Sequence, residues 1–575
     1  MKHTSWRLLL SLFAIAGVML VAVACGDDDD DSNGGTGTGT QTGGSGEPQQ
    51  GGSLRVQYVD VQSWDPHFSS FAQDIGHHGF VWRGLYKLNL ENEPVPEMAA
   101  GEPEVSDDGL TYTVTLKDGL KWSDGQPLTA EDFVAGIQRT CDPDIAGQYQ
   151  YLLSNIVGCD EYYESNGDPD SGVPAKSAEE KAQLRDAIGV RAIDDKTIEF
   201  QLEQPQPTWP IILTMWMTYP VPRHIVPESN SEWPTDPTKL AFNGPFVLQS
   251  YTPKSGAVFV RNENYAGEHQ AYLDRVEFVY IEDNAQANNA FRSGEIQAAL
   301  ADQANLTVLR NEMGDQLLSY PQPRTLGLQM QMARPPLDNE KVRLALSRAI
   351  DRETLANVVL QGAGIPSTSW IPPDVAQIAE DEFDDEVGFD PEAARQLLEE
   401  AGFPNGQGFP RLTILIRDTP QNTALAAFLQ SEFKEHLNID VDIETVDSPT
   451  RSRRFTSGDF ELFPGGWQQD YPDPENWILG QFETGGTLNH YNCSDPDIDR
   501  LIEQARFNTN NEERIDQYRQ VNELIVTRAC GVAPMYHQAN HVLIKPNVGG
   551  MHEFHSSQDR VLAADWAPEE WYLKN

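Results

Sequence analysis

Apolar and polar residues alternate along several short stretches of the chain, which is the pattern of a half-buried β-strand. In residues 110–122, apolar side chains occupy every second position of the first seven, with threonines between them. The dipeptide Asp118-Gly119 follows, and this pair is typical of a tight hairpin turn. The same alternation predicts strands in three further segments: 196–202, 276–281 and 439–446.

Four other stretches repeat apolar residues with the period of an amphipathic helix. One starts with Thr129 and Asp132 in capping-box spacing, and another has Asp390 as a cap, then a proline and later a glycine stop. Helices are therefore predicted over 128–139, 338–351, 390–402 and 494–505. Because strands and helices mix throughout and no repeat or low-complexity break follows residue 52, the sequence predicts an α/β fold with interleaved domains.

The N-terminus has the layout of a secretory signal peptide, with Lys2 and Arg7 ahead of an apolar run. Small residues before Cys25 resemble a bacterial lipoprotein signal, in which this cysteine is lipidated, although Ala22 stands where leucine is usual. An ordinary cleavage site followed by a chance cysteine is the alternative. No other segment approaches the roughly 20 apolar residues of a transmembrane helix. We therefore predict a signal peptide over 1–24 and a lipid anchor to the membrane.

The segment 25–52 starts at this cysteine and continues with sequence rich in glycine, threonine and serine. It has no apolar residue that could pack, so it is predicted to be a flexible linker. Its run of five aspartates could suggest a calcium site, but we interpret it as a solvated spacer that an anionic surface repels.

Acidic residues outnumber basic residues about two to one, because 88 aspartates and glutamates stand against 41 lysines and arginines. The formal net charge of −47 argues against a nucleic-acid partner, since phosphate backbones need a basic surface. An anionic membrane surface would also repel the protein. This composition favours a soluble extracellular protein.

The cysteine count is odd, with five in the chain. If Cys25 carries lipid, four remain, and these can oxidise outside the membrane. Nearest-neighbour pairing gives Cys141–Cys159 and Cys493–Cys530, and the two other pairings stay open on sequence alone. A zinc site is not expected, because no Cys-x-x-Cys or His-x₃-His grouping accompanies these cysteines.

Signatures of catalysis are missing from the sequence. It has no Gly-x-Ser-x-Gly elbow, no His-Glu-x-x-His motif and no phosphate-binding Gly-x-x-x-x-Gly-Lys loop. His77-His78 is the one adjacent histidine pair, and a single pair makes a poor metal site. We therefore predict that the protein is not an enzyme and has no metal or cofactor. A secreted hydrolase is the less favoured alternative.

Three longer stretches carry a family resemblance: 104–133, 243–267 and 335–355. In this order and spacing they are similar to blocks of the bacterial extracellular solute-binding proteins of family 5, the peptide/nickel class that serves ABC importers. The likeness runs from about Leu54 to about Ile544. Turn glycines and core positions account for the blocks themselves, so they indicate the fold and not the ligand site.

The resemblance implies a two-lobed, periplasmic-binding-protein-like α/β fold that encloses its ligand between the lobes. Lobe I would span 53–321 and 538–575, with an extra subdomain near 91–235, and lobe II would span 322–537. The protein would act as a monomer that captures a peptide and delivers it to an ABC permease and ATPase complex in the membrane. Family members also carry nickel chelates and oligosaccharides, so a non-peptide solute stays open. A surface receptor or adhesion module that feeds no transporter is a further alternative.

One loop, 465–477 with the sequence GGWQQDYPDPENW, combines aromatic rings, prolines and acids. In peptide-binding members, an aspartate at the position of Asp470 pairs with the α-ammonium group of the peptide. A fixed carboxylate in a closed cleft suits this cation, and the prolines hold the loop in place. Trp467 and Tyr471 would flank the ligand with rigid aromatic surface. The alternative is that Asp470 is a turn residue and that the tryptophans belong to the core.

A second ligand contact is implied at Arg417, which ends a predicted strand. In the dipeptide-binding branch, an arginine at the matching place binds the carboxylate of the ligand. Arg417 lies 53 residues before Asp470, and this spacing fits the branch without gaps. A guanidinium fork suits a carboxylate, and two fixed charges would favour short peptides of one length. The alternative is a surface arginine at a strand end.

Overall fold

The computed structural model describes the following residues: 47–89, 92–167, 173–226, 233–379, 381–551 and 567–574. All of them fall within the unit Glu47–Asn575. The predicted signal peptide, 1–24, and the predicted lipidation site, Cys25, lie outside the described residues.

A mixed sheet of eleven strands runs through the protein. In order across the sheet, its strands are β16 (Val441–Val446), β15 (Leu412–Arg417), β17 (Leu462–Gln468), β13 (Leu317–Met330), β18 (Val532–Ile544), β12 (Ala298–Leu300), β2 (Ser53–Tyr58), β11 (Arg275–Tyr280), β10 (Gly256–Arg261) and β9 (Phe246–Thr252), with β14 (Gly364–Pro366) beside β18. The pairs β15–β16 and β2–β11 are parallel, whereas β13 is antiparallel to both of its neighbours. The predicted strands at 196–202, 276–281 and 439–446 all form.

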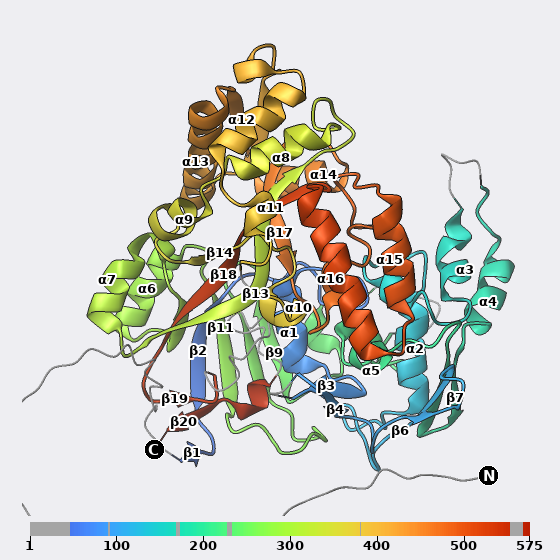
Figure 1. Ribbon diagram of the computed structural model, residues 1–575. Coiled ribbons are helices and arrows are strands. Elements are labelled where there is room, and N and C mark those ends of the chain that lie inside the picture. The colour runs from blue at the N-terminus through green and yellow to red at the C-terminus, as the bar shows by residue number, and fades with distance from the viewer. Residues whose placement is uncertain are drawn as a thin grey trace, which may run out of the picture. The chain divides into compact units, whose positions relative to one another are not determined.

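Two long strands connect the parts of this sheet. β13 has 14 residues and β18 has 13, and Figure 1 shows them running from the level of β2 and β11 up to the helices α8, α12 and α13. The expected lobe boundaries, at 321/322 and 537/538, fall inside these two strands. Their ladder shifts register between Pro321 and Thr325. The class that was predicted, a two-lobed α/β fold, is confirmed.

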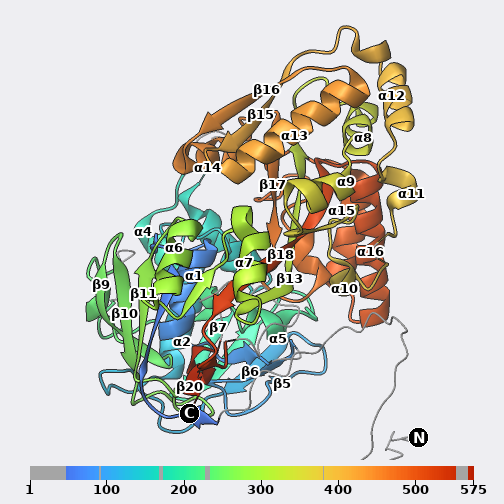
Figure 2. The ribbon, with the colours of Figure 1, turned by 90° about the vertical axis from the view of Figure 1, so that its left-hand side faces the viewer.

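One lobe carries β15, β16 and β17 with helices packed over them (Figure 2). The helices are α8 (Glu340–Arg348), α12 (Pro391–Glu400), α13 (Pro420–Leu437), α14 (Ser448–Thr456), α15 (Pro496–Arg506) and α16 (Asn511–Thr527), with three short ones, α9 (Arg352–Thr354), α10 (Pro373–Ala376) and α11 (Asp384–Val387). Aspartates cap two of these helices. Asp390, the predicted cap, accepts from the N–H groups of Glu392 and Ala393, and Asp495 accepts from that of Asp497. The apolar faces of α8, α12 and α13 bury Leu346, Leu398 and Phe433, respectively, against the sheet.

The other lobe holds β2 and β9 to β12, and it includes the region predicted as an extra subdomain. That region contains a four-stranded sheet, β5 (Glu104–Val105), β6 (Thr111–Thr115), β8 (Thr197–Gln201) and β7 (Val190–Asp194), with the pair β3 (Tyr86–Leu88) and β4 (Pro94–Pro96) near its start. The helices of this lobe are α1 (Ala72–Val81), α2 (Ala130–Thr140), α3 (Cys159–Tyr163), α4 (Ala178–Asp186), α5 (Trp209–Ile212), α6 (Asn284–Ser293) and α7 (Leu306–Met313). The predicted capping box starts α2, because Asp132 accepts from the N–H of Thr129 at 2.9 Å.

The hairpin predicted at Asp118-Gly119 is wrong. β6 forms as expected, but it pairs with β5 and β8 and not with a strand after the turn. The residues after the turn pack inward instead, and Leu120 and Trp122 are buried in the core. The chain does turn at Asp118-Gly119, where Gly119 has a φ of 71°, but burial of Leu120 and Trp122 takes the following residues into the core and not into a second hairpin strand.

The linker predicted over 25–52 ends too late. Pro48 and Gln49 form a short strand, β1, that pairs with β20 (Tyr572–Lys574), and β20 also pairs with β19 (Val548–Gly549). Gly51 then donates its N–H to the carbonyl of Tyr272 at 2.7 Å. Backbone pairing with the far end of the chain orders these residues although their side chains offer nothing to pack.

The four cysteines of the body form two disulfides in the nearest-neighbour arrangement. Cys141 and Cys159 are joined, with an S–S distance of 2.02 Å, and they tie the end of α2 to α3. Cys493 and Cys530 are joined, with an S–S distance of 2.10 Å, and they tie the segment before α15 to the start of β18. All four side chains are buried.

Candidate functional site

The loop 465–477 is held together by one amide side chain. Asn476 accepts hydrogen bonds at its Oδ1 from the indole Nε1 of Trp467, at 3.1 Å, and from the backbone N–H of Asp470, at 2.9 Å. Its Nδ2 donates to Oδ2 of Asp470 at 3.3 Å. The turn Pro474–Trp477 places Asn476 there, and Asp473 caps this turn. The position of the Asp470 carboxylate is thus fixed by its own loop.

Two of the three acids in this loop have partners inside the protein. Asp473 forms a two-pronged ion pair with Arg514, with N–O distances of 2.8 and 2.5 Å. Glu475 is fully buried and accepts from three hydroxyl groups: Thr208 at 2.9 Å, Tyr471 at 3.1 Å and Tyr518 at 3.2 Å. Burial and the nearby charge of Asp473 raise the pKa of Glu475 to about 7. Asp473 and Glu475 therefore hold the loop in place through contacts within the protein.

Asp470, the third acid, has hydrogen bonds but no cation. Its Oδ2 accepts from the hydroxyl of Tyr149 at 3.0 Å, besides the bond from Asn476. Among the described residues, no lysine, arginine or histidine forms an ion pair with it. Burial raises the pKa of this carboxyl from 3.8 to about 7, although the two hydrogen bonds oppose the change. A positive charge placed beside Asp470 would therefore be strongly favoured.

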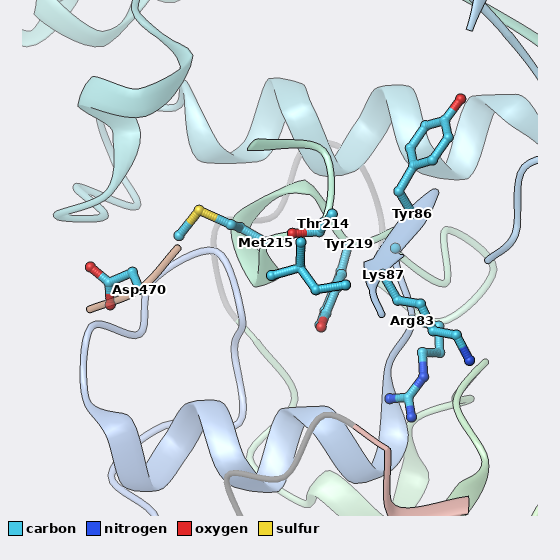
Figure 3. A pocket seen from close by; sticks show the side chains of 9 residues that line it. Arg83, Tyr86, Lys87, Thr214, Met215, Tyr219 and Asp470 are labelled. Atoms are coloured by element: carbon cyan, nitrogen blue, oxygen red, sulfur yellow. The ribbon is translucent and has the colours of Figure 1, made fainter. Parts of the chain in front are cut away.

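Asp470 lines a pocket together with residues of the other lobe. The other lining residues are Arg83, Gly84, Tyr86, Lys87, Leu88, Thr214, Met215 and Tyr219. Figure 3 shows Asp470 on one side, Arg83 and Lys87 on the opposite side, and the Met215 side chain reaching toward Asp470. The pocket is thus acidic at one end and apolar along part of its wall.

The basic residues at the far side of the pocket are already paired. Arg83 contacts Glu569 at 2.5 Å and Glu97 at 3.4 Å. Lys87 lies 3.5 Å from each of the same two carboxylates. The hydroxyl of Tyr265 lies within hydrogen-bond reach of both Glu97 and Glu569 and can donate its one hydrogen to either carboxylate. Two cations and two anions therefore balance one another within the protein at this end.

The structure places the two predicted aromatic residues differently. Trp467 is half-buried on β17, next to the Asp470 loop. Tyr471 is only 1% exposed and does not line the pocket, because its hydroxyl is bound to Glu475. The tyrosine that reaches Asp470 is Tyr149, which sequence reasoning missed. Nothing near Tyr149 in the sequence marks it, since 321 positions separate it from its partner.

Arg417 stands at the exposed end of β15, outside the lining of the Asp470 pocket. It belongs to a group of positive charges with Arg324 and Arg451. Burial and the charges of Arg417 and Arg324 lower the pKa of Arg451 to about 10. Arg451 donates to the carbonyl of Pro464 at 2.7 Å, and its guanidinium carbon lies 3.8 Å from the centre of the Phe463 ring. This arginine group borders β17, the strand that leads into the Asp470 loop.

Among the described residues, three side-chain hydrogen bonds join the region 91–235 to the lobe that carries Asp470. They are Tyr149 to Asp470 at 3.0 Å, Thr208 to Glu475 at 2.9 Å, and Arg506 to Ser154 at 2.8 Å. Two of the three involve acids of the loop 465–477. Separating these two parts of the molecule would therefore break bonds to Asp470 and Glu475 at the same time.

The adjacent histidines make protein contacts instead of a metal site. His77 Nε2 lies 2.9 Å from the hydroxyl of Tyr280, and His78 Nε2 lies 3.1 Å from the carbonyl of Ser63. Burial lowers the pKa of His77 to about 4. Within the described residues, no group of three or more histidine, cysteine or acidic side chains is placed to bind a metal ion. No helix in the described ranges is long and apolar enough to cross a membrane.

Comparison with solved structures supports the same architecture. An oligopeptide-binding protein of an ABC transporter, OppAIV from Borrelia burgdorferi, superposes with a TM-score of 0.75 at 25% identity, covering 87% of this chain and 96% of that chain. The murein tripeptide binding protein MppA of Escherichia coli gives 0.76 at 25% identity, covering 92% and 99%. OppA of Haemophilus influenzae, in complex with the peptide RPPGFSPFR, gives 0.78 at 21% identity, covering 92% and 100%, and this likeness concerns the fold alone.

Sequence comparison points the same way. The chain is 29% identical to the probable deoxycholate-binding periplasmic protein YgiS of Escherichia coli, over 86% of this chain and 88% of that protein. It is 27% identical to the periplasmic oligopeptide-binding protein OppA of the same species, over 86% and 89%. The model of the bacterial extracellular solute-binding proteins, family 5 middle region, matches residues 93–489. Since this match spans more than half of the chain, the protein belongs to the family 5 bacterial extracellular solute-binding proteins.

Proposed function

We propose that this protein is the peptide-capturing component of an ABC importer, and that Asp470 binds the amino terminus of the peptide. The observation that carries the proposal is the Asp470 carboxylate, which lines a pocket and has no cationic partner among the described residues. The other two acids of the same loop are already bound by Arg514 and by hydroxyl groups. Of these three carboxylates, Asp470 is thus the one with which a cationic group of a ligand can pair.

A peptide α-ammonium group fits this position chemically. It is a compact cation with three N–H donors, and charge-assisted bonds to a fixed carboxylate are among the stronger hydrogen bonds. Asn476 and Tyr149 already hold Asp470 in place, so little ordering is needed when the ligand binds. Trp467 would offer rigid aromatic surface next to the amino terminus. Tyr471 would act indirectly, by fixing Glu475 at the base of the loop.

Arg417 is proposed as the contact for the carboxylate at the other end of the ligand. It adds to the positive potential of the group that also contains Arg324 and Arg451. A ligand with a positive amino end at Asp470 and a negative carboxyl end near this group would match both charges. Short peptides have this distribution, which supports a preference for dipeptides or tripeptides.

In this transport role the protein would act at the membrane as a lipid-anchored monomer. Lipidation at Cys25 would hold it on the outer face, with the linker giving it reach to the permease and ATPase partners. The lobes 53–321 with 538–575, and 322–537, would close on the peptide by bending at β13 and β18. No bond chemistry is proposed.

A non-peptide solute is the alternative within the same transport role. Relatives include a protein named for deoxycholate binding and one named heme-binding protein A, from Haemophilus influenzae. A ligand whose only charge is negative would gain nothing from Asp470 and would be repelled by it once the carboxyl ionises. The amino end of the ligand is therefore the feature to test.

The test compares a tripeptide mixture with its N-acetylated form by isothermal titration calorimetry. Wild-type protein should bind the free-amine mixture at least ~100-fold more tightly, because removing one partner of a buried ion pair costs about 3–5 kcal/mol. Asp470→Asn should lose this preference. Asp440→Asn, an exposed aspartate in the same lobe, is the matched control and should bind like wild type. Equal affinity of wild type for both mixtures would reject the amine anchor.

A further inference from the structure

A second pocket lies where β13 and β18 run between the lobes. It contains about 750 Å³ of empty space, part of which is open to solvent, and it shares no lining residue with the Asp470 pocket. Five of its lining residues are prolines, and His537 of β18 forms part of the wall. The prolines are Pro321, Pro323, Pro366, Pro372 and Pro373.

The backbone explains why this space exists. The ladder between β13 and β18 runs to Pro321 opposite Ala539 and resumes only with Thr325 opposite His537. Three residues of β13 thus face one residue of β18, and the strand bulges outward there. Proline has no N–H to pair with and fixes its own backbone angle, so the walls around the bulge are stiff, and the five prolines with Ile365 and Val375 make much of them apolar. Such a site is preformed and needs little ordering to receive a ligand.

Hydrogen bonding fixes which nitrogen of His537 carries the proton. Thr325 has a single hydroxyl hydrogen, which it donates to the carbonyl of Trp370 at 2.8 Å. His537 Nδ1 lies 2.9 Å from the same hydroxyl oxygen, so Nδ1 must be the donor. The other ring nitrogen, Nε2, is therefore left with an acceptor lone pair. Burial also lowers the pKa of His537 to about 3, which keeps the ring neutral.

This acceptor has no hydrogen-bond partner among the residues that the structure describes. His537 is only 6% exposed, and within the described residues its Nε2 forms no hydrogen bond. A buried acceptor without a donor is costly, and most such groups in folded proteins are satisfied by water or by a ligand. The pocket lining thus includes a histidine whose buried acceptor lacks a donor, beside the five prolines and the polar residues Gln322, Ser367 and Asp374.

We propose that this pocket is a second ligand site, for a small neutral organic molecule with an apolar body and one hydroxyl or amide N–H group. The apolar body would pack on the prolines and on Val375, and the donor would bind Nε2 of His537. Asp374 is exposed and is the one charged residue in the pocket lining, so an anionic molecule is disfavoured. The site is separate from the proposed peptide function and does not depend on it.

The test uses a pair of probes that differ only in the donor: p-cresol and its methyl ether, 4-methylanisole. Binding to the mature chain is measured by ligand-observed NMR titration. Wild type should bind p-cresol about tenfold more tightly than the ether, because a buried acceptor gains a donor only from the phenol. His537→Phe should remove this difference. Equal affinity of wild type for the two probes would overturn the proposal and would leave water as the partner of Nε2.

A second variant keeps the test valid if His537→Phe fails to fold. Val375→Trp should fill the pocket from the short helix α10 and weaken both probes about tenfold or more. Val358→Trp is the matched control, because Val358 is 69% exposed and lies outside the pocket lining, and it should bind like wild type. Asp470→Asn should also leave probe binding unchanged. Probe binding that survives in Val375→Trp, or is lost in Asp470→Asn, would place the probes elsewhere and overturn the proposal.

Discussion

Charged side chains lie at both ends of the Asp470 pocket, and their charges are compensated in different ways. At one end, Arg83 and Lys87 are neutralised by Glu97 and Glu569, all within the protein. At the other end, Asp470 has two hydrogen bonds and no cation among the described residues. The four paired residues come from distant parts of one lobe. Asp470 belongs to the other lobe and faces the first one across the pocket.

This difference distinguishes the paired charges around Glu569, which stabilise the fold, from the charge of Asp470, which is available to bind a ligand. Charges that are buried and mutually paired are costly to break, because one partner is left uncompensated in the interior. A partly buried, desolvated carboxylate without a cation is itself destabilising, and proteins keep such groups mainly where they serve a function. Substitutions at Glu569 should therefore change stability, while substitutions at Asp470 should change binding.

The largest expected effect is the loss of stability caused by Glu569→Gln. It leaves Arg83 and Lys87 with a single carboxylate, and the free energy of unfolding should fall by about 3–5 kcal/mol. Denaturant unfolding followed by tryptophan fluorescence would measure this loss. The neighbouring Glu570→Gln is the control, because Glu570 pairs with His269 at a partly exposed site and should cost at most about 1 kcal/mol. Similar losses of unfolding free energy in both variants would contradict the larger contribution expected from the buried charges.

The second prediction concerns pH and sharpens the role of Asp470. Its pKa is about 7 in the folded, ligand-free protein, so a proton must leave when an ammonium group binds below that pH. Affinity for peptides should thus fall by up to about tenfold per pH unit below pH 7. Above about pH 8 the α-amine loses its own charge, so affinity should be greatest between these values. Calorimetry from pH 5.5 to 8.5 would measure the profile.

The same proton affects stability in the opposite direction. The folded carboxyl holds its proton up to about pH 7, whereas the unfolded one releases it near 3.8. Between these values the folded state binds more protons, so the ligand-free protein should lose stability as pH rises. Asp470→Asn should flatten the affinity profile and reduce this pH dependence, while Glu475, whose pKa is also about 7, keeps its share. An unchanged profile in Asp470→Asn would contradict the assignment.

The smallest effect is expected at Arg417, because its side chain is exposed. Arg417→Ala should weaken free-acid dipeptides and tripeptides about five- to tenfold, and should affect their C-terminal amides less. A thermal-shift series with peptides of two to eight residues would measure this, since stabilisation follows ligand affinity. Arg411→Ala is the control, because Arg411 lies just before the other end of β15 and pairs with Asp442 at the surface. A flat series that the mutation does not alter would leave Asp470 as the sole anchor.

Local sequence was a good guide wherever neighbours along the chain decide the structure. The predicted helices form close to the expected places, and the cap predicted at Asp390 binds backbone N–H groups within three residues of itself. The strand and the turn at Asp118-Gly119 were predicted and form, but the hairpin was wrong, because Leu120 and Trp122 after the turn are buried in the core. Residues 48–52 were predicted to be free, and pairing with the chain end ordered them.

The site itself could be located from the sequence only through family resemblance. The loop 465–477 stands out by its composition, but its three acids look alike there. Nothing local shows that Arg514, 41 positions away, neutralises Asp473, or that Tyr149, 321 positions away, reaches Asp470. Tyr471 was predicted as a ligand contact, and the structure buries it against Glu475.

By itself, the sequence determined the α/β elements, the acidic surface charge and the loop that carries Asp470, because each follows from residue types and their spacing. The tertiary structure alone decided which carboxylate of the loop lines the pocket without a cation among the described residues. That outcome depends on partners brought from remote segments by the long strands β13 and β18 and by packing between the lobes. Charge compensation acts through space, so it becomes visible only when the folded chain sets the distances.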